Sequence, residues 1–239
     1  VAYWLFVKAG VDPILSLPIL VALLFFAGTA VYRLVIRPVT KARDVIMASM
    51  VATFGVAIVV ENVMSYVWRP DPRILKPAYT GTSFFVGELA ISKGPLIGFS
   101  MAILAIAVLY WFLHHTYTGK AVQATWQNPM GAALVGINPG HVSLITFGLS
   151  IGSAGAAGVA MALIYAFYPS VQSVWTMFVF LVTIVGGVGS VIGTGLAGLL
   201  IGLIIGISGA FLPFVWVNVL LFALLLVILL FKPEGLFGS

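Results

Sequence analysis

The chain has 239 residues, 62% of them hydrophobic and 7% charged, with a formal net charge of +5 and no cysteine. A soluble domain carries about 25% charged residues, so the composition excludes one and indicates a polytopic α-helical membrane protein. Long continuous apolar runs exclude the alternating pattern of a β-barrel. Without cysteine there are no disulfides, thiol catalysis or Cys-ligated metals. Basic residues dispersed between apolar runs argue against nucleic-acid binding.

The apolar runs predict about seven membrane spans in a single transmembrane domain over 1–239, because a crossing helix needs roughly 20 residues. The spans are about 14–36, 44–67, 95–115, 141–166, 173–189, 191–210 and 213–231.

The loops between these spans set the expected orientation. Loop 33–43 is the densest in lysine and arginine, which predicts that it is cytoplasmic. By alternation, the segment 116–140 and the tail from Lys232 are cytoplasmic too. The loop 68–94, which contains several prolines, is then an ordered external loop.

A polar segment, Gly119–Asn138, lies between two apolar spans and carries its own helix signals. Asn128 is suited to the N-cap, Pro129 to the first helical position and Gly136 to the stop. They predict a helix over 129–135, too short to cross a bilayer. Near-helical spacing of apolar side chains would give it one apolar face. A surface helix of this kind is what a membrane subunit needs to receive force from a soluble partner.

Glycines are concentrated in the second half of the chain. Gly148 and Gly152 are four residues apart, and Gly198, Gly202 and Gly206 repeat that interval. Small residues at this spacing let helix backbones approach closely in lipid, so tight packing is the preferred interpretation.

The segment Gly186–Ser190 has three glycines, which weaken a helix by about 1 kcal/mol each. It is either a plain turn between two spans or irregular backbone that lines a translocation pathway. The residues that would line the pathway are Thr183, Gly186, Gly187, Gly189, Ser190 and Thr194.

Glu61 and Asn62 lie near the outer end of the second span. A carboxylate in a membrane usually faces a cavity or a partner. Both residues are therefore candidates for the pathway, and a solvated helix end is the alternative. Asn218 in the last span is a weaker case of the same kind.

No enzymatic constellation is visible, and we expect no metal site. His114 and His115 are adjacent, so on a helix they point to different faces and cannot easily share a metal. A phosphate-binding loop ending in Gly119-Lys120 would need glycine at the position of His114. The chain therefore cannot hydrolyse ATP by that route.

Four stretches, in order, resemble the permease subunits of branched-chain amino acid ABC transporters. Gly119–Asn138 resembles their cytoplasmic loop and Arg33–Pro38 their basic loop ending in Arg-Pro. Val185–Gly198 is similar to their glycine-rich segment, and Phe231–Gly238 to their closing Pro-x-Gly-Leu-Phe-Gly signature. Family members normally begin with further hydrophobic segments and an Asn-Phe-Ala-His-Gly motif. Neither is present, so the first part of the permease is expected to be missing.

The resemblance implies a bacterial plasma-membrane importer that moves branched-chain or other amino acids. Its partners would be a second permease subunit, two cytoplasmic ATPase subunits that bind ATP and magnesium, and an external solute-binding protein. This chain would hold no cofactor. The coupling helix that docks on the ATPase would comprise Trp126, Gln127, Asn128, Pro129, Met130, Ala133, Leu134, Gly136 and Ile137.

Three alternatives stay open at this point. The first is a passive channel for a small neutral solute such as urea, which would need no surface helix for a partner. The second is an importer permease for urea or an amide. The third, a membrane enzyme, is disfavoured because no clustered titratable groups lie at membrane depth.

Overall fold

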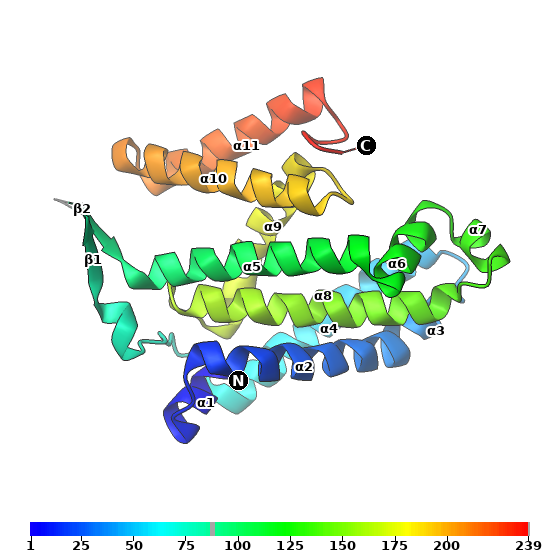
Figure 1. Ribbon diagram of the computed structural model, residues 1–239, viewed down its shortest axis with the longest axis horizontal. Helices are drawn as coiled ribbons and strands as arrows, with labels where there is room; N and C mark the ends of the chain where they lie inside the picture. Colours follow the sequence, from blue (N-terminus) through cyan, green and yellow to red (C-terminus); the bar gives the residue numbers. More distant parts are fainter. Residues whose placement is uncertain (87–88, 239) are drawn as a thin grey trace. The chain divides into compact units, whose positions relative to one another are not determined.

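The computed structural model describes residues 1–86 and 89–238, and nearly all of its regular structure is α-helical (Figure 1). The chain divides into two compact units, Val1–Ser170 and Val171–Ser239. The division falls in the loop between two predicted spans, 141–166 and 173–189. We describe each unit by itself.

Among its described residues, the first unit contains eight α-helices of 3 to 24 residues, a π-helical turn, a 3-10 turn and one hairpin. They are α1 (Ala2–Ala9), α2 (Pro13–Val31), η1 (Tyr32–Ile36), α3 (Arg37–Val39), α4 (Val45–Trp68), η2 (Ala78–Gly81), β1 (Ser83–Val86), β2 (Leu89–Ser92), α5 (Lys93–His115), α6 (Tyr117–Gln127), α7 (Pro129–Leu134) and α8 (Pro139–Ala162). The short η3 (Pro169–Val171) leads into the second unit, which contains α9 (Gln172–Gly186), α10 (Val191–Phe211) and α11 (Phe214–Phe231).

The helices confirm the predicted all-α polytopic membrane fold. Among the described residues, six stretches are long and apolar enough to cross a membrane: Pro13–Val39, Val45–Trp68, Lys93–His115, Pro139–Ala162, Pro169–Gly186 and Val191–Phe211. The apolar helix α11 is slightly shorter and coincides with the seventh predicted span. Several short elements were not predicted, among them α1, α6 and the antiparallel β1–β2 hairpin in the loop 68–94.

The first unit is built on the close packing of α2 against α8. A methyl group added at Gly148 would lie 2.7 Å from the Thr29 methyl carbon, and one at Gly28 would lie 3.1 Å from the Gly148 Cα. A methyl group at Gly152 would lie 3.2 Å from the carbonyl oxygen of Val21. These distances leave no room for larger side chains, so the predicted tight packing is confirmed for Gly148 and Gly152.

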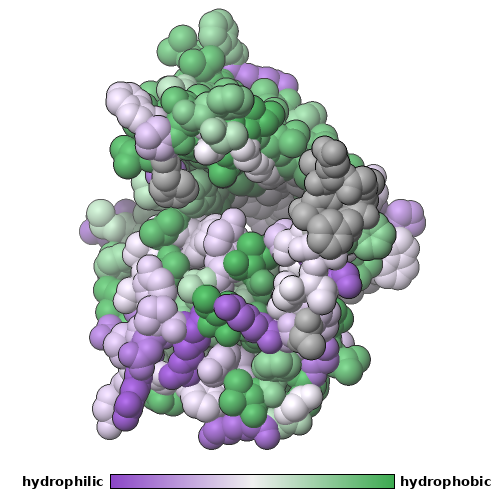
Figure 2. All heavy atoms as spheres, turned by 90° about the vertical axis from the view of Figure 1, so that its left-hand side faces the viewer, coloured by the Kyte–Doolittle hydropathy of each residue, from purple (hydrophilic) through white to green (hydrophobic). Residues whose placement is uncertain are grey.

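The loop after α4 lies at the end of the first unit that faces the viewer in Figure 2, where hydrophilic side chains gather among apolar ones. Leu75 is 1% exposed and packs against Ala162 and Leu163 at the end of α8. The Arg73 guanidinium lies 5.3 Å and 5.0 Å from the ring centres of Tyr3 and Trp4 on α1, distances at which a cation is attracted to an aromatic face. The loop is therefore fixed to α1 and α8.

A polar contact fixes the same loop to the start of α2. The Tyr79 hydroxyl donates a hydrogen bond of 3.0 Å to Asp12 Oδ1, and that oxygen also accepts from the Ile14 amide as the N-cap of α2. Partial burial, followed by the hydrogen bond and negative charge of Asp12, raises the pKa of Tyr79 to about 12. The neutral phenol is thus the form that this contact favours.

The second unit has its own apolar core among its three helices. The core consists of Leu181, Val185, Ala197, Ile201, Val217 and Leu221, all almost fully buried. Gly198 has only the Val182 side chain near its added methyl group, at 3.8 Å, and nothing lies within 4 Å at Gly202 or Gly206. Within the described chain no neighbour packs against Gly202 or Gly206, so tight packing at these two positions stays a prediction.

Candidate functional site

The polar segment between α5 and α8 forms two helices rather than one. Thr116 ends α5 and caps α6, since its Oγ1 accepts a hydrogen bond of 3.0 Å from the Gly119 amide. A methyl group at Gly119 would lie 2.1 Å from the Phe112 carbonyl oxygen, so only glycine allows α6 to fold against the end of α5. The threonine cap before Gly119 was the signal that could have identified α6 from sequence.

The short helix predicted over 129–135 is present as α7. Asn128 Oδ1 accepts a hydrogen bond of 2.9 Å from the Gly131 amide, and Pro129 occupies the first helical position. Gly136 follows the helix with φ 87°, a conformation that favours glycine. Ala132 is the buried residue of the helix, which leaves the rest of its surface available.

The apolar side chains of this helix point outward. Met130 is 77% exposed and Leu134 is 85% exposed. Trp126, near the end of the preceding helix α6, is 70% exposed. Ala133 is exposed as well, as are the flanking Gln127, Asn128, Pro129 and Gly136, whereas Ile137 is half-buried. We call Trp126, Met130, Leu134 and the 77%-exposed Val135 the α7 apolar face. Figure 1 shows α7 at the same end of the first unit as α3, opposite the β1–β2 hairpin.

The two polar candidates of the second span lie on α4, a helix with no buried residue in the described structure. Glu61 is half-buried and Asn62 is exposed. The Asn62 carboxamide donates a hydrogen bond of 2.8 Å to the Ile58 carbonyl of its own helix, so this donor has a local partner. Their place on a pathway stays a prediction.

The glycine-rich segment is a turn between α9 and α10 rather than a bend within one helix. Gly187 and Gly189 have φ 90° and 93°. Ser190 caps α10 by accepting 2.9 Å from the Gly193 amide. The Thr183 and Thr194 hydroxyls donate to Val179 and Ser190 carbonyls within their helices. These local bonds account for the polar groups structurally, and their role in a pathway stays a prediction.

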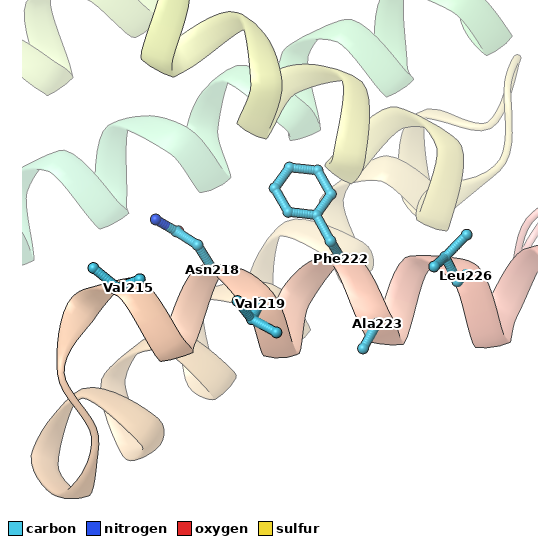
Figure 3. Close-up of a pocket in the computed structure, with 6 residues that line it drawn as sticks. All are labelled: Val215, Asn218, Val219, Phe222, Ala223 and Leu226. Carbon is cyan, nitrogen blue, oxygen red and sulfur yellow. The ribbon is translucent and has the colours of Figure 1, made fainter.

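The structure also contains a groove, of which only Asn218 had been singled out from the sequence. It runs along α11 and is lined by Val215, Asn218, Val219, Phe222, Ala223 and Leu226 (Figure 3). Asn218 and Phe222 point to the same side of the helix (Figure 3), and the neighbouring Val217 and Leu221 are buried in the core of the second unit. An amide on an apolar membrane helix is costly unless it faces a cavity or another polar group.

The two adjacent histidines do not converge. The His114 ring lies 4.1 Å from that of Tyr110, and the His115 ring stacks on Trp111 at 6.4 Å. Within the ranges that the structure describes, no three His, Cys, Asp or Glu side chains are grouped closely enough to hold a metal ion.

Multiple membrane-length helices, with a capped helix in one of the loops between them, define a polytopic membrane protein. The family described as "Branched-chain amino acid transport system / permease component" matches residues 1–230. The chain belongs to this family, and it is a multi-pass protein of the plasma membrane.

Individual relatives agree with the family. The high-affinity branched-chain amino acid transport system permease proteins LivH of Salmonella typhimurium and of Escherichia coli are each 27% identical over 217 residues, covering 88% of this chain and 70% of theirs. The corresponding permease BraD of Pseudomonas aeruginosa is 24% identical over 252 residues, covering 100% of this chain and 80% of its own. No solved structure matches the chain.

Proposed function

We propose that this chain is a permease subunit of an ATP-binding cassette importer for branched-chain or chemically similar amino acids, and that α7 couples it to an ATPase. The α7 apolar face is the observation that carries the proposal. Met130 and Leu134 are four residues apart on a helix that Asn128 caps and Ala132 anchors by its burial. Both side chains are more than three-quarters exposed. Contiguous exposed apolar surface of this kind marks a binding site for a partner.

In this proposal the ATPase partner supplies the energy of ATP hydrolysis that drives transport. A phosphate-binding loop is missing where Gly119-Lys120 would end it. We therefore assign ATP and magnesium to two cytoplasmic ATPase subunits. A second permease subunit would complete the membrane core, and an external binding protein would deliver substrate, as the family membership supports.

An aliphatic amino acid suits the apolar character of the groove on α11. Its lining is hydrophobic except for the Asn218 carboxamide. Such a surface accommodates a branched side chain, while the carboxamide can accept or donate a hydrogen bond. Family membership favours the amino-acid importer over the alternatives, because the relatives that match are branched-chain amino acid permeases.

A charge placed on the α7 apolar face tests the coupling role. In Leu134→Asp, a carboxylate would have to be buried in the ATPase groove, so we expect uptake to fall at least tenfold and the ATPase subunits to be lost on purification. The matched control is Tyr117→Asp, which adds the same charge at an 83%-exposed aromatic position on α6. Normal uptake and normal co-purification of Leu134→Asp would contradict the assignment.

Orientation is tested separately with single cysteines, because the native chain has none. Lys120 on α6 and Ser83 in β1 are both exposed and lie at opposite ends of the first unit. A membrane-impermeant thiol reagent applied to intact cells should label Ser83→Cys and leave Lys120→Cys untouched. The reverse pattern would place α7 outside the cell, where no cytoplasmic ATPase can reach it.

The energy source separates the importer from the channel. Depletion of ATP should abolish uptake of leucine, isoleucine or valine by cells that carry the complete system, because the ATPases drive each cycle. Uptake of any solute that persists unchanged after depletion, and follows its gradient in both directions, would support the passive channel instead.

A further inference from the structure

The last residues of the chain turn back on the second unit. After α11 the chain lies against the turn between α9 and α10 (Figure 1). The Leu236 amide donates 2.8 Å to the Val185 carbonyl, and the Lys232 Nζ donates 2.8 Å to the Leu236 carbonyl. We call the segment 232–238 the C-terminal clasp.

Glycines on both sides make this contact possible. Gly187 has φ 90°, and a methyl group on it would lie 2.3 Å from the Gly238 nitrogen. Gly235 has φ 85°, and a methyl group on it would lie 2.5 Å from the Ile184 carbonyl oxygen. Each position therefore excludes other residues twice, by its backbone conformation and by the space around it.

The clasp satisfies a backbone group that a helix end leaves open. The last four carbonyls of a helix have no partner within the helix. Val185 precedes the final residue of α9, and its carbonyl accepts a hydrogen bond from the Leu236 amide. The Leu236 side chain packs against the buried core of the three helices.

A single segment thus joins the ends of three helices. It continues from α11, bonds to α9 at Val185 and reaches α10, where a methyl group on Gly193 would lie 2.6 Å from the Phe237 Cβ. Two of the stretches singled out in the sequence, Val185–Gly198 and Phe231–Gly238, are therefore the two halves of one contact.

We propose that the C-terminal clasp locks α9, α10 and α11 into one rigid body that stays closed throughout the transport cycle. Transporters alternate access mainly by rigid-body movement of one bundle against another. A bundle moves as a unit only if its helix ends cannot separate. The clasp provides this restraint through backbone contacts. The inference goes beyond the proposed function, and only the turnover arm of its test rests on that function.

The test compares thiol labelling at two neighbouring positions in the complete transporter. Glu234 is exposed, whereas Leu236 is half-buried against the core. With a membrane-permeant maleimide, we expect Leu236→Cys to react at least tenfold more slowly than Glu234→Cys. The ratio should be the same at rest and with ATP and leucine present. Equal rates at rest, or faster reaction at position 236 during turnover, would overturn the proposal.

A glycine substitution then opens the clasp deliberately. In a Leu236→Cys background, Gly235→Ala should raise labelling at position 236 to that of position 234 and lower uptake at least tenfold. The control is Gly209→Ala in α10, where nothing lies within 4 Å of the added methyl group. Normal uptake with position 236 fully labelled would show that the clasp is dispensable. If Gly235→Ala is not recovered from membranes, the proposal is decided by the comparison of Leu236→Cys with Glu234→Cys in the chain that keeps Gly235.

Discussion

Helices α8 and α10 carry glycines at the same four-residue interval, yet the glycines have opposite surroundings. On α8, a methyl group at Gly148 would press on Thr29 of α2 at 2.7 Å. On α10, a methyl group at Gly202 or Gly206 would meet nothing within 4 Å. The interval therefore permits close approach without specifying it. A partner helix with a matching small residue, such as Gly28 on α2, decides whether the approach occurs.

The ends of the two units differ in a related way. The first unit is closed by side chains, with Leu75 buried against α8 and Tyr79 bonded to Asp12. The second unit is closed by backbone, with Gly187 and Gly235 packed together. Truncation of a side chain should therefore open the first unit, whereas addition of one should open the second.

The largest effect is expected from Gly148→Leu. The new side chain has no space beside Thr29 and the Phe25 ring, so α2 and α8 must separate, at a cost of about 3 kcal/mol, the upper end of typical overpacking. The matched control is Gly202→Leu on α10. Thermal unfolding in detergent should show a large loss for the first variant alone. An equal loss for both would remove the distinction between the two helices.

A smaller but clear loss is expected from Leu75→Ala, which tests the side-chain closure of the first unit. Leu75 is 1% exposed, and its truncation should cost about 2 kcal/mol, the low end for a buried leucine, because a loop can collapse around the cavity left behind. Its neighbour Ile74, 48% exposed, provides the control Ile74→Ala. Limited proteolysis of the loop 68–82 should accelerate only in Leu75→Ala. Similar cleavage rates in the two variants would show that Leu75 does not anchor the loop.

The sequence predicted those features that depend on local signals. The spans follow from long apolar runs. The start of α7 follows from its predicted cap, Asn128, which accepts from the Gly131 amide, and the structure shows a similar cap at Asp44 before α4. The α7 helix was predictable for this reason. The helix α6 was missed because its threonine cap stands within a polar segment that lacks an apolar run.

Contacts between distant backbone groups were beyond sequence reasoning. The bond between Leu236 and Val185 joins two motifs that were identified separately, and no side-chain pattern marks backbone that pairs across the fold. The same holds for Gly202 and Gly148, whose local sequences look alike while only one has a partner helix in the structure. Function at the α7 face was suggested by its cap and apolar spacing, and the exposure of that face came only from the structure.

Tyr79→Phe should have a modest effect that depends on pH. It removes the hydrogen bond to Asp12, worth about 1 kcal/mol at this partly exposed site. Because the fold raises the Tyr79 pKa from 10.0 to about 12, the native contact contributes fully below pH 10 and is lost as pH rises toward 12. Native protein and Tyr79→Phe should therefore differ in unfolding temperature at pH 8, and the difference should shrink between pH 10 and 12. A constant difference across that range would show that ionisation of Tyr79 is not linked to stability.

The smallest effect is expected from replacing glycine by alanine on the two helices. In Gly202→Ala the methyl group enters open space, and the better helix propensity of alanine should raise stability by a few tenths of a kcal/mol, up to about 1. In Gly152→Ala the same methyl group presses on the Val21 carbonyl oxygen at 3.2 Å, so stability should fall. Measured by thermal unfolding in one detergent, the two variants should shift in opposite directions. A fall in both would mean that the glycine face of α10 is packed against another surface in the folded protein. The two helices would then differ only in what their glycines pack against, not in whether they are packed.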